Sequence, residues 1–199
     1  MKARISTALA AAVLAIGFSA PASAATVTFG PFPDAAQMNP TADSTTGTVF
    51  ENVVGSISGV RRSPWQGSAI DENDSTSYYT SVSGNSSASY DFGMSMREIS
   101  FLWGSPDNYN DLDIILTGAG GTVTINGTQA QGPVAIGAQY VTISDVGLFD
   151  SVTFRSGRNA FEFANLETAQ VPVPAALPLL VGALGGLGFA ARRRKNKAA

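Results

Sequence analysis

The segment Glu98-Ile99-Ser100-Phe101-Leu102-Trp103 gives the clearest indication of the fold. Side chains alternate between the two faces of a β-strand, so Ile99, Phe101 and Trp103 would share one face. Alternation of this kind is typical of a strand with one face in a hydrophobic core. The segment therefore predicts a β-strand that contributes two aromatic rings to the core.

Similar short segments lie on both sides of this strand and are separated by glycine- and asparagine-bearing breaks. They occupy residues 87–92, 111–116, 122–125, 140–143, 151–154 and 160–163. No segment shows a sustained helical period, and strands at intervals of about 10 to 12 residues favour an all-β domain. We therefore expect a β-sandwich of jelly-roll kind over residues 25–170. Asn126-Gly127 predicts a hairpin turn, and residues 39–47 predict a loop with no packed role.

The charge of residues 25–170 is strongly negative. This range holds all 15 acidic residues of the chain, and its only basic residues are five arginines, so its formal net charge is −10. It contains no lysine, whereas proteins that bind nucleic acid need lysine and arginine for the phosphates. We therefore expect no nucleic-acid partner.

Cysteine and histidine are absent from the whole chain. Their absence excludes disulfides, a Ser-His-Asp triad, and zinc, haem or iron–sulfur ligation by the usual residues. Carboxylate chemistry remains, such as glycoside hydrolysis by two acidic side chains, as does binding of oxygen-ligated metals such as calcium. The glutamates lie far apart in the sequence, and none belongs to a catalytic motif (Glu51, Glu72, Glu98, Glu162 and Glu167).

The loop after Trp103 is rich in side chains that carry oxygen atoms. Calcium binds six to eight oxygens, and the candidate ligands are Asp107, Asn110, Asp111 and Asp113. The loop could instead bind a sugar, with Trp103 or Tyr109 as a stacking platform. A third interpretation is a structural turn, in which Pro106 fixes φ and the Asp and Asn side chains bond to their own backbone. The cluster Asp71-Glu72-Asn73-Asp74 could likewise bind calcium or a sugar, or it could form a solvated loop.

The C-terminal segment has three parts in a fixed order. Val171-Pro172-Val173-Pro174-Ala175 is followed by an uncharged span to Ala191 and then by a basic cluster (Arg192, Arg193, Arg194 and Lys195, with Lys197 beyond). A helix over residues 175–191 would reach about 25 Å, near the lower limit for a membrane span. The basic tail at 192–197 favours a cytoplasmic C-terminus. Residues 171–199 therefore predict a single membrane helix, which a simple tail anchor would also explain.

The N-terminus has the pattern of a secretory signal peptide. Lys2 and Arg4 precede an apolar stretch, and Ala22-Ser23-Ala24 is a small-x-small site for signal peptidase. We expect residues 1–24 to be removed by cleavage after Ala24. Residues 25–170 would then lie outside the cytoplasm as an ectodomain.

The C-terminal segment resembles the PEP-CTERM family of sorting signals, in particular the variant that reads Val-Pro-Leu-Pro-Ala. This chain has Val173 where that variant usually has leucine, and it lacks the glutamate of the parent Pro-Glu-Pro motif. The resemblance implies processing by an exosortase-type enzyme in the membrane of a Gram-negative cell. It also implies that an anchored precursor is delivered to the cell envelope, the surface or the extracellular matrix.

The ectodomain is similar to a family of exosortase-dependent surface proteins, and three segments carry the similarity. They are Tyr79-Thr80-Ser81-Val82, the Trp-Gly-Ser-x-Asp-x-Tyr-Asn loop at 103–110, and Asn159-Ala160-Phe161-Glu162. We therefore expect an exported, non-catalytic surface or matrix protein that binds glycan, such as an exopolysaccharide, or calcium. The alternatives are a secreted glycoside hydrolase and a simple tail-anchored envelope protein.

Overall fold

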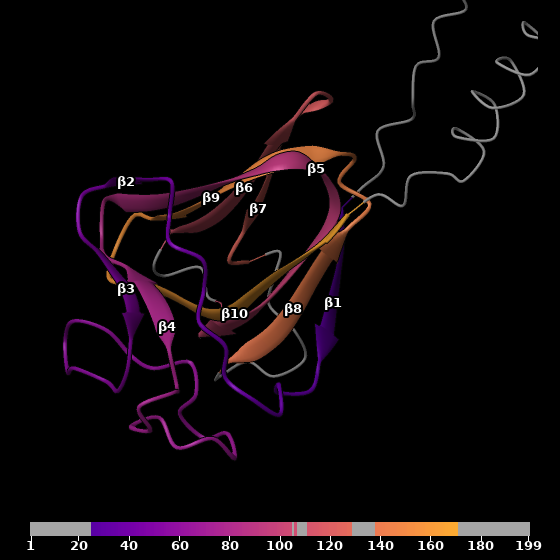
Figure 1. The fold of residues 1–199 in the computed structure, drawn as a ribbon. Coiled ribbons are helices and arrows are strands. Elements are labelled where there is room, and N and C mark those ends of the chain that lie inside the picture. Colours follow the sequence, from indigo (N-terminus) through magenta and orange to yellow (C-terminus); the bar gives the residue numbers. More distant parts are fainter. Residues whose placement is uncertain (1–24, 105, 107–110, 129–137, 171–199) are drawn as a thin grey trace, which may run out of the picture.

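The computed structural model describes residues 25–104, 106, 111–128 and 138–170 as an all-β structure, and this confirms the prediction of an all-β domain (Figure 1). These residues form one sheet of ten strands in which every pairing is antiparallel, and they contain no helix. The strands are β1 (Thr26–Gly30), β2 (Ser44–Thr46), β3 (Val49–Val53), β4 (Tyr79–Val82), β5 (Ser86–Gly104), β6 (Leu112–Gly118), β7 (Gly121–Asn126), β8 (Gln139–Ser144), β9 (Phe149–Ser156) and β10 (Phe161–Gln170).

Strand β5 is 19 residues long and joins two arms of the sheet. Its first half pairs with β2 and β9, and the sheet continues from β9 through β6 to β7. Its second half pairs with β8 and β10, and the sheet continues to β1 on one side and through β4 to β3 on the other. We call these the β9 arm and the β10 arm.

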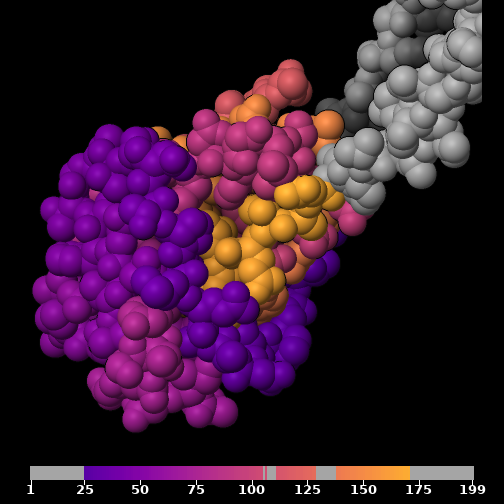
Figure 2. All heavy atoms as spheres, viewed as in Figure 1, coloured from indigo at the N-terminus to yellow at the C-terminus, as the bar shows by residue number. Residues whose placement is uncertain are grey.

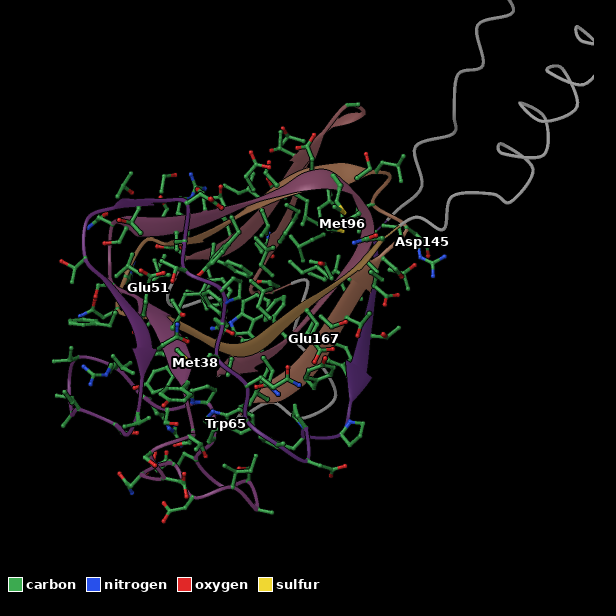
Figure 3. All side chains as sticks on the ribbon, in the orientation of Figure 1. Met38, Glu51, Trp65, Met96, Asp145 and Glu167 are labelled. Carbon is green, nitrogen blue, oxygen red and sulfur yellow. The ribbon has the colours of Figure 1, made fainter. Side chains whose placement is uncertain are left out.

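The sequence predicted two strands where the structure has one. Segments 87–92 and 98–103 both belong to β5, which bends between them. The pairing of β5 with β9 shifts register between Asp91 and Met96, at the bend (Figure 3). Gly93 has a φ of 63° there, a conformation that glycine adopts without steric cost. The glycine thus turns the strand from one arm to the other without ending it.

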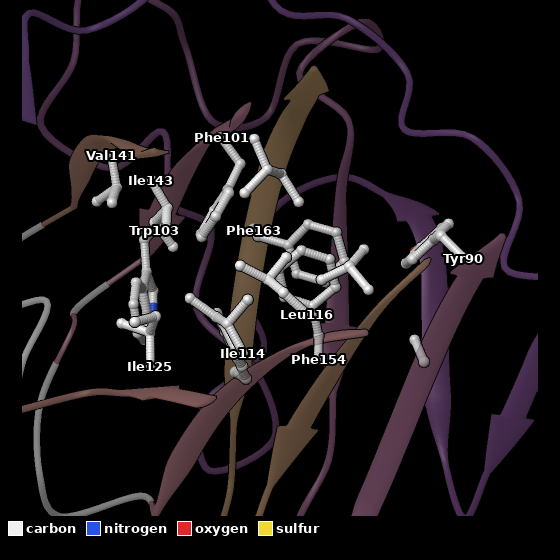
Figure 4. Close-up of a cluster of buried hydrophobic side chains, with 14 of the residues drawn as sticks. Tyr90, Phe101, Trp103, Ile114, Leu116, Ile125, Val141, Ile143, Phe154 and Phe163 are labelled. Carbon is white, nitrogen blue, oxygen red and sulfur yellow. The ribbon is translucent and has the colours of Figure 1, made fainter. Parts of the chain in front are cut away.

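The main core confirms the predicted inward face of the segment at 98–103. Ile99, Phe101 and Trp103 are all buried in one hydrophobic cluster (Figure 4). Phe154 of β9 stacks on Phe163 of β10, with ring centroids 4.1 Å apart. Rings from the two arms therefore pack directly against each other, and the core lies between the arms.

A second, smaller core covers the other face of the β10 arm. The loop at 54–78 places Trp65 against Tyr79 and Leu102, and all three side chains are fully buried (Figure 3). The Trp65 indole N–H donates to the carbonyl of Tyr78 at 3.1 Å. Burial raises the pKa of Tyr79, whose neutral hydroxyl donates to the Gly55 carbonyl at 2.6 Å. The loop is thus fixed to the sheet by both packing and hydrogen bonds.

Residues 39–47 do have a packed role, so the prediction of an unpacked loop was wrong. Residues 44–46 form β2, and the residues between β1 and β2 lie against β10 (Figure 2). Asn39 is only 3% exposed, and its amide donates to the Thr80 hydroxyl and to the Phe163 carbonyl, each at 3.0 Å. Its side-chain oxygen accepts the Leu166 N–H at 3.0 Å. One asparagine thus supplies the hydrogen bonds that a neighbouring strand would otherwise provide.

Among the described residues, the hairpin expected at Asn126-Gly127 is not present. Strand β7 pairs with β6, while the next strand, β8, pairs with β1 and β5. The hairpin turn lies instead between β6 and β7, where Gly118 is paired with Gly121. The Gly127 N–H donates to the Leu112 carbonyl at 2.9 Å and so extends the β6–β7 pairing. The Asn-Gly pair was misleading because it lies at the end of the β6–β7 pairing and does not connect two paired strands.

Replacing Gly118 with alanine should destabilise the protein by about 1–3 kcal/mol, the usual cost of overpacking. A Cβ atom at this position would lie 2.3 Å from the Leu148 carbonyl oxygen and 2.6 Å from the Phe149 Cα. Both are backbone atoms at the start of β9, and they cannot move without disturbing the sheet. The midpoint of urea unfolding measures the effect.

Gly120→Ala is the matched control, because a Cβ atom there would have no neighbour within 4 Å. This exposed substitution should change stability by less than about 0.5 kcal/mol. Equal unfolding midpoints for the two variants would contradict the close approach of β6 to β9.

Candidate functional site

Two of the four predicted metal ligands lie within the described residues, and each forms an ion pair with an arginine. The Asp113 carboxylate on β6 accepts hydrogen bonds from the Arg155 guanidinium on β9, with Nε at 3.1 Å. Asp111 lies 3.4 Å from Nε of Arg158 and is exposed. The other two predicted ligands, Asp107 and Asn110, lie outside the described residues. In the part of the chain that the structure describes, no three acidic side chains come together as a metal site.

A shallow polar groove of about 390 Å³ surrounds Asp111 and Asp113. Its lining comes from the start of β5, the end of β9 and the start of β6, with Thr46 from β2 (Thr46, Asn85, Ser86, Ser87, Asp111, Asp113, Arg155, Ser156 and Gly157). The Gly157 N–H donates to the Asp111 carbonyl at 3.1 Å. A Cβ atom on Gly157 would lie 2.7 Å from that of Asp111, so glycine is needed for this approach. The groove thus combines hydroxyls, one amide, the Asp113–Arg155 ion pair and the Asp111 carboxylate.

The groove continues into the surface on the outer side of the β9 arm, which we call the hydroxyl face. Cross-strand register places its residues in three rows, and most of them are serine or threonine. One row is Thr46, Ser87, Arg155, Asp113 and Asn126; the next is Ser44, Ser89, Thr153, Ile115 and Thr124; the third is Asp91, Ser151, Thr117 and Thr122. The hydroxyl face therefore runs across five strands.

Hydrogen bonds between neighbouring strands order the hydroxyl face. The Ser89 and Thr153 hydroxyls lie 2.8 Å apart, as do those of Thr46 and Ser87. Each hydroxyl has one donor and two acceptor positions, so a paired hydroxyl can still bond to a ligand. This face was not predicted from the sequence, although the alternation of serine and threonine with apolar residues in segments 87–92 and 151–154 could have revealed it.

Trp103 lies in the core and not on the surface, which does not fit the proposed stacking platform. Its ring is fully buried and stacks on Phe161, with centroids 4.7 Å apart. The other proposed platform, Tyr109, lies outside the described residues. The only other tryptophan, Trp65, is also buried. The hydroxyl face therefore does not use a tryptophan ring for stacking.

The cluster at 71–74 forms local turns. The Asp71 carboxylate accepts the Asn73 N–H at 2.9 Å, and the Asp74 carboxylate accepts the Thr76 N–H at 2.8 Å and its hydroxyl at 2.7 Å. The two hydrogen bonds from Thr76, above all that from its hydroxyl, lower the pKa of Asp74. Turns of this type are a common use of aspartate.

Four of the five glutamates accept hydrogen bonds from neighbouring segments. Glu51 accepts the Ala42 N–H at 2.6 Å, and Glu162 accepts the Arg62 N–H at 2.9 Å. Glu72 accepts the Ser56 hydroxyl at 2.7 Å, and Glu167 accepts the Tyr140 hydroxyl at 3.4 Å. Each of these side chains thus serves as a hydrogen-bond acceptor for a neighbouring segment.

The sorting elements predicted from the sequence lie outside the described residues. They are the cleavage site at Ala22 and Ala24, the motif Val171-Pro172-Val173-Pro174-Ala175, and the basic residues Arg192, Arg193, Arg194 and Lys195. In the part of the chain that the structure does describe, no helix has the length and hydropathy needed to cross a membrane.

The segments that carried the ectodomain resemblance lie on adjacent strands. Residues 79–82 form β4, Phe161 and Glu162 begin β10, and Trp103 and Gly104 end β5, with β10 between the other two strands. Glu162 is a point of contact, because it pairs with Ser81 on one side and with Gly104 on the other. Searches against protein-family models, curated proteins and solved structures find no match to this chain.

Proposed function

We propose that the chain is an exported, non-catalytic protein of the cell surface or extracellular matrix, sorted by an exosortase-type enzyme. The order of the C-terminal segment carries this proposal: a Pro-x-Pro motif, an uncharged span and a basic cluster. The last strand, β10, ends at Gln170, immediately before Val171 of the motif. Folded domain and sorting signal would therefore meet with no linker between them, and the precursor would hold the domain close to the membrane.

For the ectodomain we infer a β-sandwich of jelly-roll kind, with the β9 arm and the β10 arm as its two layers. The stacking of Phe154 on Phe163 and the burial of Phe101 between the arms support this architecture. In such a sandwich the hydroxyl face is the outer surface of one layer. It would be available to ligands along its whole width.

The ligand that we favour for the hydroxyl face and its groove is a polysaccharide. Sugar hydroxyls bond well to serine, threonine, asparagine and carboxylate groups, which the groove and the hydroxyl face supply. Calcium is a weaker candidate at the same place, because Asp111 and Asp113 already pair with arginines. A cation would have to compete with these two positive charges for its ligands.

Replacing both Pro172 and Pro174 with alanine should block processing of the sorting signal. Proline keeps the segment and the residue before it extended, which is how proteases hold a substrate. The span and the basic cluster remain intact, so insertion into the membrane should continue. Intact mass and fractionation of the full-length protein should show an unprocessed precursor accumulating in the inner membrane.

Pro178→Ala is the matched control, because Pro178 lies in the apolar span and outside the motif. This variant should be processed like the wild type. If the wild type and the double variant have the same mass and fractionate alike, the C-terminal segment is a simple anchor and the sorting proposal is wrong.

A further inference from the structure

Strand β7 is an edge strand with no charged residue near it in the sequence. Among the described residues its only partner is β6. The chain carries no Asp, Glu, Lys or Arg from Ile114 to Ser144, although residues 25–170 have a net charge of −10. Unpaired N–H and C=O groups along such an edge can pair with another strand, and proteins usually prevent this with charges, proline or bulges. Strand β7 has none of these features.

Two other edges of the sheet do carry protective features. Strand β3 contains Glu51, and its pairing with β4 shifts register next to Asn52, which has a φ of 49°. Strand β2 is only three residues long and follows Asp43. Strand β7 thus lacks the protection that these two other edges of the same sheet carry.

Strand β1 is a second uncharged edge, but its position differs. It begins near the end of β10, whereas the β6–β7 hairpin extends beyond the neighbouring strands (Figure 1). A Cβ atom on either Gly120 or Gly121 at the hairpin tip would have no neighbour within 4 Å. The β7 edge is therefore the more accessible of the two.

We propose that β7 pairs antiparallel with β7 of a second copy of this chain, about a two-fold axis next to Thr124. The absence of charge permits this contact, since two copies of an acidic protein repel each other except where their surfaces are neutral. With Thr124 opposite its own copy, Val123 faces Ile125 of the other chain. Thr122 faces Asn126 of the other chain. Apolar side chains therefore lie opposite apolar ones, and polar side chains lie opposite polar ones.

The pairing would join two hydroxyl faces into one surface. Thr122 and Thr124 belong to the hydroxyl face, while Val123 and Ile125 point toward the core. A two-fold axis perpendicular to the sheet keeps the hydroxyl faces of both copies on the same side. The dimer would present ten strands of hydroxyl face in place of five.

The test uses the absence of cysteine from the chain. In the full-length protein, Thr124→Cys introduces a single thiol, and the proposal places it opposite its own copy. Directly opposed residues on antiparallel strands have Cβ atoms about 4.5–5.5 Å apart, within the range in which a mild oxidant can form a disulfide after small adjustment. We expect a species of twice the monomer mass on a non-reducing gel, and a reductant should remove it.

Thr117→Cys is the matched control, since Thr117 is exposed on the same face but lies one strand further in, on β6. Three strand spacings and an offset of four residues along the strands would place its thiol about 20 Å from that of the second copy, too far to cross-link. Thr124→Cys should give on the order of tenfold more dimer than Thr117→Cys. Association through any other surface, including residues 171–199, would not favour position 124 over position 117.

Two results would overturn the proposal. One is equal cross-linking at positions 124 and 117, with far-UV circular dichroism of both reduced variants matching the wild type. The other is efficient cross-linking of Thr28→Cys, on the β1 edge, with none at position 124. Neither result depends on sorting or on glycan binding, so the proposed function is tested separately.

Discussion

Replacing Trp103 with alanine should lower the free energy of unfolding by about 3–5 kcal/mol, the usual cost of removing a large buried aromatic side chain. Trp103 is fully buried, stacks on Phe161 and lies next to Phe101. For a chain of this size each kcal/mol corresponds to a fall in melting temperature of about 2–4 °C. Urea unfolding of the purified protein, followed by far-UV circular dichroism, measures the loss.

Trp103→Phe provides the control, because it keeps a ring against Phe161. The Trp103 indole N–H is buried and has no hydrogen-bond partner among the described residues, so its removal should cost nothing. We therefore expect Trp103→Phe to lose less than half as much stability as Trp103→Ala. If Trp103→Ala instead keeps its stability but loses affinity for polysaccharide, Trp103 is a ligand platform and its assignment to the core is wrong.

Replacing Asn39 with alanine should destabilise the protein by about 2–4 kcal/mol, although only one small polar side chain changes. Removal of the amide leaves the Phe163 carbonyl and the Leu166 N–H without their partner in a buried place. Each buried polar group that loses its partner costs about 1–3 kcal/mol. The N-terminal residues should also detach more easily from β10, which hydrogen exchange of the Leu166 amide would detect.

Gln37→Ala is the comparison for this prediction. Gln37 lies two residues earlier in the same segment, and its side chain makes only an exposed contact of 3.5 Å with Glu167. This substitution should change stability by less than about 0.5 kcal/mol. Similar losses for Asn39→Ala and Gln37→Ala would show that the Asn39 hydrogen bonds do not hold the segment.

Much of the strand content could be predicted from alternation alone. Segments with an apolar residue at every second position, such as Ile99, Phe101 and Trp103, lie within strands and face the core. Strands β1 to β4 were missed because each has only three to five residues and, in β3, the polar Glu51 and Asn52 interrupt the pattern. The continuity of β5 was also missed, because Gly93 looks like a strand end when its neighbours in space are unknown.

The candidate site could be predicted only in part. The sequence shows Asp111 and Asp113 as an acidic cluster, but their arginine partners lie more than 40 residues further along the chain. Only the register of β6 with β9 brings Asp113 to Arg155. The pattern of a single strand shows which residues face outward, but not which residues of other strands lie next to them. The hydroxyl face is therefore a property of the sheet and not of any one segment.

The position of β10 determines how the domain would respond to a mechanical load. Strand β10 lies between β4 and β5 and ends at Gln170, next to the proposed sorting motif. A pull on a chain tethered at its C-terminus would act along β10, parallel to the strand axis. The hydrogen bonds to β4 and to β5 would then be loaded together in shear, and would not break one after another from one end of the strand. Since β5 continues into the β9 arm, the same pull would be transmitted across the bend to the hydroxyl face.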